Sequence, residues 1–235
     1  MKIHAHGVTN VGLVRDHNED SLLVDVDHGV FAVADGVGGM PGGDVASAAA
    51  IGAVKTILKT EGAAALENLP RLADQAHRAV RGAADGFPGD GIATTFTLAY
   101  VSGGRARVVH VGDSFVLIVR DSSCRPLTRE HNVENERGDI QSLAPYPPRY
   151  RYALTRVLGQ AEPLVADVFE ENLQPGDWLI VATDGLTDMV EFPNIAEICG
   201  GARNVKSAAE SLLDAALARG GHDNITFVVI AVEAG

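Results

Sequence analysis

Short runs of apolar and β-branched residues, separated by turn-forming residues, occupy much of the chain. A short apolar run bounded by turns is typical of a strand buried in a core. Two of these runs end alike, because VFAVADG at 30–36 and LIVATDG at 179–185 both close on Asp-Gly. Gly103-Gly104, between two other runs, predicts a hairpin turn. The predicted strands are 3–8, 11–14, 21–26, 30–34, 93–101, 105–112, 114–120, 164–170, 177–183 and 224–233.

Apolar residues at helical spacing predict helices between these strands. We expect Asp44 to cap the first helix through its side-chain oxygen. Pro70 falls in the first turn of the second helix, where its missing N–H is harmless. His77 on that helix fits a solvent-exposed face better than a metal ligand. The predicted helices are 45–59, 67–84, 193–199 and 204–219.

The order of these elements favours an α+β fold. Strands cluster at both ends and in the middle, which differs from the regular alternation of a doubly wound parallel sheet. We expect a four-layer αββα sandwich, with two mostly antiparallel β-sheets flanked by pairs of helices. No composition break or linker divides the chain, so residues 1–235 are expected to form a single domain.

Composition and charge exclude some classes of function. The chain has 46% hydrophobic and 21% charged residues, which is ordinary for a globular protein. A net charge of −12 argues against a nucleic-acid partner. Cys124 and Cys199 lie far apart, which favours a reducing compartment without a disulfide framework. No membrane span or targeting signal is visible, so we expect a cytoplasmic chain without tails.

Carboxylates recur where the predicted strands end or begin. Asp35 and Asp184 close the two Asp-Gly strands, Asp113 follows a third, Asp223 precedes the last, and a Glu-Asp pair at 19–20 precedes another. Crowding so many carboxylates is costly unless a cation neutralises them. Mg²⁺ and Mn²⁺ prefer oxygen ligands, and two such ions can share a bridging carboxylate and activate a water. One Asp-Gly alone is usually just a turn, so the prediction depends on the joint occurrence.

Six motifs around these carboxylates resemble those of a known family. They occur in order and at family spacing: RDHNED at 15–20, ADGVGGMPGG at 34–43, ATT at 93–95, VGDS at 111–114, ATDGLTD at 182–188 and GHDN at 221–224. Together they resemble the metal-dependent protein serine/threonine phosphatases of type 2C, the PPM family, in its compact bacterial form. The resemblance covers essentially the whole chain.

The resemblance implies a metal-binding role for five residues. Asp35 matches the aspartate that bridges two ions, and Gly36 matches the glycine that offers its carbonyl to one of them. Asp184 and Asp223 match the ligands of the other ion. Asp113, together with Asp184, matches the third-metal position of bacterial members. The implied cofactors are two to three divalent cations, Mn²⁺ or Mg²⁺.

Four further residues match family positions around the ions. Arg15 matches the arginine that grips the substrate phosphate, a role suited to its planar fork. Glu19 and Asp20 match acids that hold metal-bound waters. Asn224 adjoins the last metal aspartate and is expected to orient it.

The resemblance implies hydrolysis of phosphoserine and phosphothreonine on proteins by a metal-bridging water or hydroxide, without a phosphoenzyme. The implied partners are phosphorylated proteins, with a cognate kinase or its targets among them, and the implied oligomeric state is a monomer. A catalytically silent module that binds a partner or senses metal is the alternative from another class. A phosphatase acting on anti-sigma-factor antagonists is a third reading, although such proteins usually carry regulatory domains. Retention of the matched arginine and metal aspartates favours the enzyme.

Three positions depart from the family pattern. Val37 stands where many members carry a histidine proposed as general acid, so the proton donor to the leaving group is open. Phe115 replaces the usual arginine after GDS, and Ala93 replaces a glycine. None of these removes a ligand. The segment 129–153 matches the family's variable flap, whose tyrosines and arginines either contact a partner or pack on the domain: Tyr146, Arg149, Tyr150, Arg151 and Tyr152.

Overall fold

Two antiparallel sheets of five strands form the centre of the computed structural model, which describes residues 1–37, 42–87, 91–137, 150–160 and 163–235. The strand order is β1-β10-β9-β6-β7 in one sheet and β2-β3-β4-β5-β8 in the other. The strands are β1 (Lys2–Asn10), β2 (Asp20–Asp25), β3 (Val30–Asp35), β4 (Phe96–Ser102), β5 (Arg105–Val111), β6 (Phe115–Arg120), β7 (Ser123–Pro126), β8 (Asp167–Asn172), β9 (Trp178–Ala182) and β10 (Ile225–Glu233).

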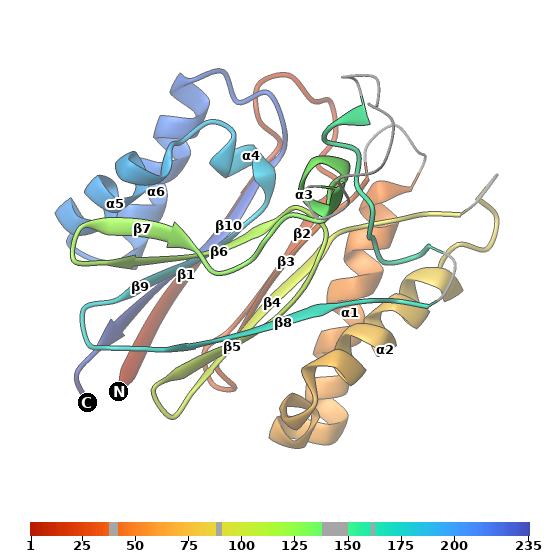
Figure 1. Cartoon of the computed structure of the whole chain (residues 1–235), viewed down its shortest axis with the longest axis horizontal. Coiled ribbons are helices and arrows are strands. Elements are labelled where there is room, and N and C mark those ends of the chain that lie inside the picture. The colour runs from red at the N-terminus through yellow and green to blue at the C-terminus, as the bar shows by residue number, and fades with distance from the viewer. Residues whose placement is uncertain (38–41, 88–90, 138–149, 161–162) are drawn as a thin grey trace.

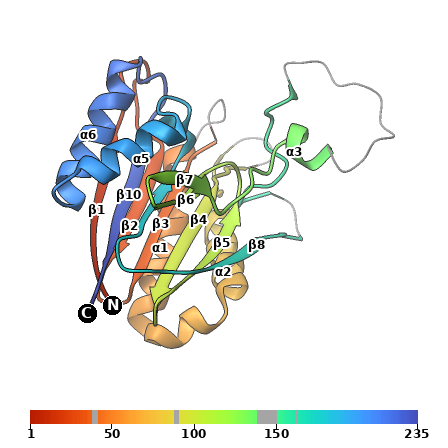
Figure 2. The same cartoon turned by 60° about the vertical axis from the view of Figure 1, so that its left-hand side comes forward.

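Helices cover the outer face of each sheet (Figures 1 and 2). One buried cluster joins α1 and α2 to the sheet that contains β3, and another joins α5 and α6 to the sheet that contains β10. The helices are α1 (Gly43–Glu61), the 3₁₀ helix η1 (Gly62–Glu67), α2 (Leu69–Gly82), α3 (Val133–Arg137), α4 (Asp184–Thr187), α5 (Phe192–Gly201) and α6 (Val205–Ala218). The expected αββα layering is therefore confirmed.

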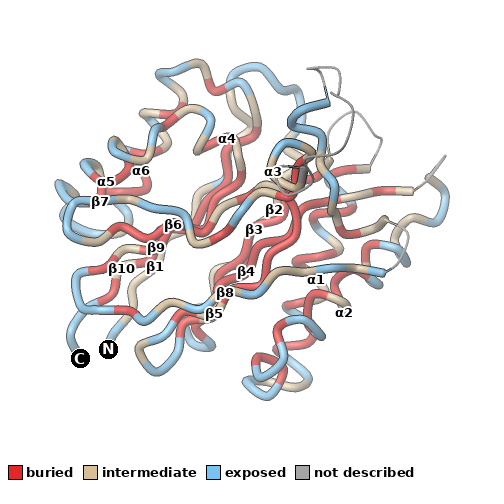
Figure 3. Tube along the Cα trace, in the orientation of Figure 1, coloured by how far each residue is buried: buried red, intermediate tan, exposed pale blue. Residues whose placement is uncertain are grey.

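Strand β3 shows why its sequence reads as one continuous apolar run. Phe31 and Val33 point into the core between the two sheets, whereas Val30, Ala32 and Ala34 belong to the core beneath α1 and α2. A strand covered on both faces has no polar face, so its residues do not alternate. Figure 3 shows the resulting band of buried residues through the inner strands. Burial of one large apolar side chain stabilises the fold by about 1.5–3 kcal/mol.

Several elements differ from the sequence prediction. Residues 11–14 form a turn rather than a strand, with Gly12 at a φ of +79°. The sequence missed β7, α3 and α4, which are too short to show a clear period. Strand β8 begins at Asp167, three residues later than expected.

Two predictions about helix residues were also wrong. Gly42 is the N-cap of α1, and no side chain caps this helix; Asp44 lies in the first turn. His77 is fully buried on α2 rather than solvent-exposed, and its Nδ1 accepts a hydrogen bond from the Gly159 N–H at 3.2 Å.

Of the helices that the structure describes, none combines the length and apolar character required to cross a bilayer. Residues 138–149 of the expected flap, including Tyr146 and Arg149, lie outside the described residues. At its two ends, Tyr150 and Tyr152 are exposed, whereas His131 is buried. The single-domain expectation for residues 1–235 stays a prediction.

Candidate metal centre

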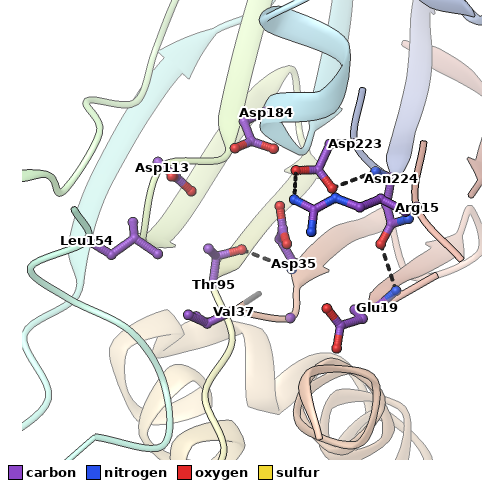
Figure 4. A pocket seen from close by; sticks show the side chains of 11 residues that line it. Arg15, Glu19, Asp35, Val37, Thr95, Asp113, Leu154, Asp184, Asp223 and Asn224 are labelled. Atoms are coloured by element: carbon purple, nitrogen blue, oxygen red, sulfur yellow. Dashed lines mark hydrogen bonds and ion pairs between the residues drawn. The ribbon is translucent and has the colours of Figure 1, made fainter. Parts of the chain in front are cut away.

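Strand ends from both sheets deliver carboxylates to one pocket (Figure 4). Asp35 is the last residue of β3, and Asp113 lies between β5 and β6. Asp184 begins α4 directly after β9, and Asp223 lies just before β10. Asp20 begins β2 and pairs with Asp35 across the ladder. Two antiparallel sheets stacked face to face thus place acids that are distant in sequence at one end of the sandwich.

The pocket collects eight of the nine residues to which the sequence assigned a role. Asp20 is the exception: it is partly buried and does not belong to the pocket lining. Val37, Thr95 and Leu154 line the same space, although sequence reasoning assigned none of them a positive role there. The full lining is Arg15, Glu19, Asp35, Gly36, Val37, Thr95, Asp113, Leu154, Asp184, Asp223 and Asn224.

The backbone around Asp35 is held by the threonine pair of the ATT motif. Thr95 Oγ1 accepts a hydrogen bond from the Asp35 N–H at 3.0 Å, and the Thr94 hydroxyl donates to the Asp35 carbonyl at 2.8 Å. The Thr95 N–H also donates to that carbonyl, at 2.8 Å. These three bonds fix the peptide on both sides of the Asp35 side chain and so restrict where its carboxylate points.

Gly36 is required by the close approach of α1. A Cβ at this position would lie 2.7 Å from the Cα of Gly43, the first residue of α1, which no real Cβ tolerates. The Gly36 N–H donates to the carbonyl of Glu19 at 3.2 Å and so ties β3 to the loop before β2. The glycine therefore allows the backbone itself to form part of the pocket wall.

Asn224 closes the loop that carries Arg15 and Glu19. Its side-chain oxygen accepts from the Glu19 N–H at 2.8 Å, and its side-chain nitrogen donates to the carbonyls of Val11 and His17 at 3.0 and 2.9 Å. The Arg15 guanidinium reaches across the pocket mouth to Asp223 Oδ2 at 2.7 Å. The Asn224 side chain thus holds the loop, and its backbone N–H donates to Asp223 Oδ1 at 2.8 Å, so Asn224 also holds the aspartate beside it.

The central carboxyls are strongly perturbed. Burial, followed by the charges of neighbouring aspartates, raises the pKa of Asp35 well above its usual range. Burial also raises the pKa of Asp20 and of Asp184 to about 7, and that of Asp113 to about 6. The carboxyl cluster therefore holds protons near neutral pH unless another positive charge replaces them.

The donor set fits hard divalent cations. Oδ1 of Asp20 and Oδ1 of Asp184 are buried without a hydrogen-bond partner, which is costly for a carboxylate unless a cation satisfies it. The lining offers carboxylate and carbonyl oxygens but no histidine or cysteine. Among the described residues, no group of three or more His, Cys, Asp or Glu side chains is already arranged to surround a metal ion. Mg²⁺ and Mn²⁺ keep several waters and bind through few protein oxygens, so the open arrangement suits them.

Sequence reasoning missed two residues next to the candidate ligands. The Thr183 hydroxyl donates to Asp20 Oδ2 at 3.0 Å and links β9 to β2. The charge of Asp188, one turn after Asp184, raises the pKa of Asp184 and of Asp113. Both residues lie inside the ATDGLTD motif. The motif therefore pointed to this part of the site, although it did not predict the hydrogen bond of Thr183 or the effect of Asp188.

Comparison with known proteins places these observations in a family. Residues 14–218 match the family model described as Protein phosphatase 2C. The serine/threonine phosphatase stp of Listeria welshimeri is 28% identical over 240 residues, which cover 97% of this chain and 95% of the relative.

Solved structures agree with this match over the whole chain. The Mycobacterium tuberculosis serine/threonine phosphatase PstP/Ppp superposes with a TM-score of 0.85 at 29% identity and covers 100% of both chains. The catalytic domain of PstP in complex with two manganese ions gives a TM-score of 0.84 at 29% identity and covers 99% of both chains. The family model matches most of this chain, and the carboxylates of the matched motifs meet in one pocket. The chain therefore belongs to the protein phosphatase 2C family.

Proposed function

We propose that this chain, a metal-dependent serine/threonine phosphatase by family, removes phosphate from phosphoserine and phosphothreonine at the pocket of Figure 4. One observation carries the assignment to this pocket. Asp35 and Asp184 are partly buried and converge from opposite sheets, and Oδ1 of Asp184 is buried without a hydrogen-bond partner. A carboxylate pair in this setting is an incomplete cation site.

Each ligand has a proposed place. Asp35 would hold two cations, with the Gly36 carbonyl on one of them and Asp184 and Asp223 on the other. Asp113, with Asp184, would hold a third cation. When bound, the cations lower the pKa of a water enough for it to attack phosphorus and neutralise the phosphate oxygens.

The residues around the ions hold the substrate and the solvent. Arg15 lies half-exposed at the pocket mouth, where its guanidinium can form two parallel hydrogen bonds with a phosphate. Glu19 and Asp20 accept hydrogen bonds from ordered waters. Val37 faces the pocket without a titratable group, so the leaving oxygen takes its proton from solvent or from another residue.

Direct attack by water is supported by the lack of a free hydroxyl nucleophile. Within the described pocket lining, Thr95 is the one residue with a hydroxyl. Its oxygen already accepts from the Asp35 N–H and is 2.9 Å from the hydroxyl of Ser114. No phosphoenzyme is therefore expected on Thr95.

Phosphate release from a phosphothreonine peptide tests the proposal. Activity should require added Mn²⁺ or Mg²⁺, stop with chelator, and fall about 1000-fold or more in Asp35→Asn or Asp184→Asn, because each change removes several kcal/mol of charge stabilisation. Asp74→Asn is the matched control, since Asp74 pairs with Arg78 on the surface of α2. Unchanged hydrolysis in chelator would refute the metal mechanism. Binding of metal and peptide without hydrolysis would favour the silent module.

Partners and cellular setting complete the proposal. The chain's substrates are phosphoproteins by family, and we propose that they include a cognate serine/threonine kinase or its targets. We further propose that the protein is a cytoplasmic monomer. A phosphoproteome of a deletion strain would identify the substrates, and enrichment of the kinase's own phosphosites is the result expected.

A further inference from the structure

Gly112 sets the direction of the Asp113 side chain. Its φ of +115° is a conformation that residues other than glycine rarely adopt, and a Cβ there would lie 2.6 Å from the Cβ of Thr95. Since Asp113 is the next residue, the orientation of the Gly112 peptide decides where its carboxylate points. A loop that depends on a glycine gains no rigidity from that residue, so another group must hold it.

His131 holds both polar groups of Gly112. Its backbone N–H donates to the Gly112 carbonyl at 2.7 Å, and its ring Nδ1 accepts from the Gly112 N–H at 3.1 Å. The residue is 2% exposed, so water does not compete for these bonds. One residue at the start of the flap segment therefore clamps the peptide that precedes Asp113.

The ring of His131 is itself fixed in one tautomer. Because Nδ1 accepts from Gly112, the proton sits on Nε2, which lies 3.2 Å from Asp167 Oδ2. Asp167 is held in turn by Arg156 Nη1 at 2.8 Å. A carboxylate behind a histidine is a common way to orient the ring and strengthen its other nitrogen as an acceptor.

A second histidine holds the segment that leads into His131. Nδ1 of His110 lies 2.8 Å from the Thr97 hydroxyl, and its Nε2 lies 3.1 Å from the Arg129 carbonyl. Since a carbonyl can only accept, Nε2 carries the proton. The rings of His110 and His131 lie 4.6 Å apart between centroids. Residues 129–131 are thus attached to β5 at two points.

We propose that His131 is a positioning residue for the third-cation site: through Asp167 and Gly112 it fixes the peptide that aims Asp113 at the pocket. The inference rests on the proposed function, which gives Asp113 that cation. It gives the start of the flap segment an indirect part in metal affinity, through the orientation of Asp113. Without the two hydrogen bonds from His131, the Gly112 peptide samples other orientations. The entropy lost when cation binding orders this peptide then weakens the net binding free energy.

Binding of Mn²⁺ alone, measured as free Mn²⁺ by electron paramagnetic resonance in chelator-treated protein, tests the inference. Asp113→Asn defines which class of bound Mn²⁺ depends on that carboxylate. His131→Gln, whose longer amide reaches toward Asp167 but leaves the Gly112 N–H without its acceptor, should raise the Kd of that class about 10–100-fold. The Mn²⁺ class that persists in Asp113→Asn should change less than about twofold in His131→Gln.

His131→Asn separates positioning from general stability. Its side-chain oxygen takes the place of Nδ1, so this variant should recover the wild-type Kd within about threefold although it loses the contact with Asp167. The matched control is His77→Asn together with His77→Gln, because buried His77 also accepts a glycine N–H, that of Gly159. Neither His77 variant should change the Asp113-dependent class.

Three results would overturn the inference, and they differ from one another. Equal Mn²⁺ binding in His131→Gln and wild type would exclude a positioning role while leaving the Asp113 site intact. Equal weakening by the His77 variants would reduce the effect to loss of packing. No change in Asp113→Asn would remove both the third-cation assignment and the role of His131.

Discussion

Asp35 and Asp184 both follow apolar strands and precede a glycine, yet they come from opposite sheets. Asp35 ends β3 opposite Asp20, whereas Asp184 begins α4 after β9 of the other sheet. Their carboxyl groups lie in one pocket at the end of the sandwich. Burial, together with the charges of neighbouring aspartates, raises the pKa of both. The two Asp-Gly sequences thus belong to strands that reach one pocket from different sheets, and they do not mark an internal duplication.

Arg15 offers a test of substrate binding apart from metal binding. Arg15→Ala should weaken phosphopeptide affinity about 10–100-fold, because hydrogen bonds from a charged donor contribute about 1.5–3 kcal/mol. Mn²⁺ affinity should be retained, since the loss of Arg15 frees Asp223 Oδ2. Isothermal titration with phosphopeptide and with Mn²⁺ separates the two. Arg71→Ala, which removes an exposed arginine paired with Glu61, is the control. Unchanged peptide affinity in Arg15→Ala would refute its role.

His110 predicts a pH dependence of folding stability. Burial lowers the pKa of His110 to about 3, from an ordinary value near 6.5. Below pH 6.5 the unfolded chain takes up a proton that the folded chain refuses, so stability is full above that pH and falls toward pH 3. The slope approaches about 1.4 kcal/mol per pH unit. Urea unfolding at several pH values should show a flatter slope in His110→Gln than in wild type. Equal slopes would contradict the assignment.

At the residue scale, the carboxylates that meet in the pocket could be predicted from the sequence, but the residues that hold them in place could not. Acidic residues at strand ends can be recognised because a buried carboxylate is unusual. Thr95, Thr183 and His131 are ordinary residue types whose hydrogen bonds depend on contacts between distant segments. Such contacts exist only once the sheets are stacked, so no local sequence pattern predicts them.

At the scale of elements, long periodic segments could be predicted and short ones could not. The continuous apolar runs of β3, β9 and β10 are distinctive because both faces of these strands are covered. Strand β7 has four residues with one side chain half-buried and the others exposed, so its place at the sheet edge leaves no hydrophobic pattern. The expected Asp44 cap failed because Gly42 and Gly43 already begin α1 where it packs against Gly36.

Two glycines around α1 give a paired prediction. Gly36→Ala should destabilise the protein by about 1–3 kcal/mol, because the added methyl overlaps the Gly43 backbone. Gly52→Ala, within α1 and with nothing near its Cβ, should instead stabilise by about 0.5–1 kcal/mol. Urea unfolding of the metal-free proteins measures both. A neutral Gly36→Ala would show that the pocket wall tolerates a side chain.

At the scale of the whole molecule, the sandwich explains why the site lies where it does. Two twisted sheets share one core, and the strand ends, loops and short helix at one end of it carry every proposed ligand. The layer order could be predicted from the order of elements, whereas the relative placement of the sheets could not, because it depends on side chains that interlock across the core.

The proposed monomer is testable at the same scale. Light scattering behind a sizing column should give the mass of one chain, with and without Mn²⁺, since every proposed ligand comes from the same chain. A dimer that forms only with Mn²⁺ would indicate that a second copy contributes to the centre.

The most direct test of the central claim is the location of bound Mn²⁺ by its anomalous scattering in crystals of the protein. We expect two strong peaks in the pocket, with Asp35 contacting both, the Gly36 carbonyl on one, and Asp184 and Asp223 on the other. A weaker third peak should lie beside Asp113. Peaks elsewhere, or a pocket that stays without manganese while the Arg15–Asp223 pair remains closed, would contradict it.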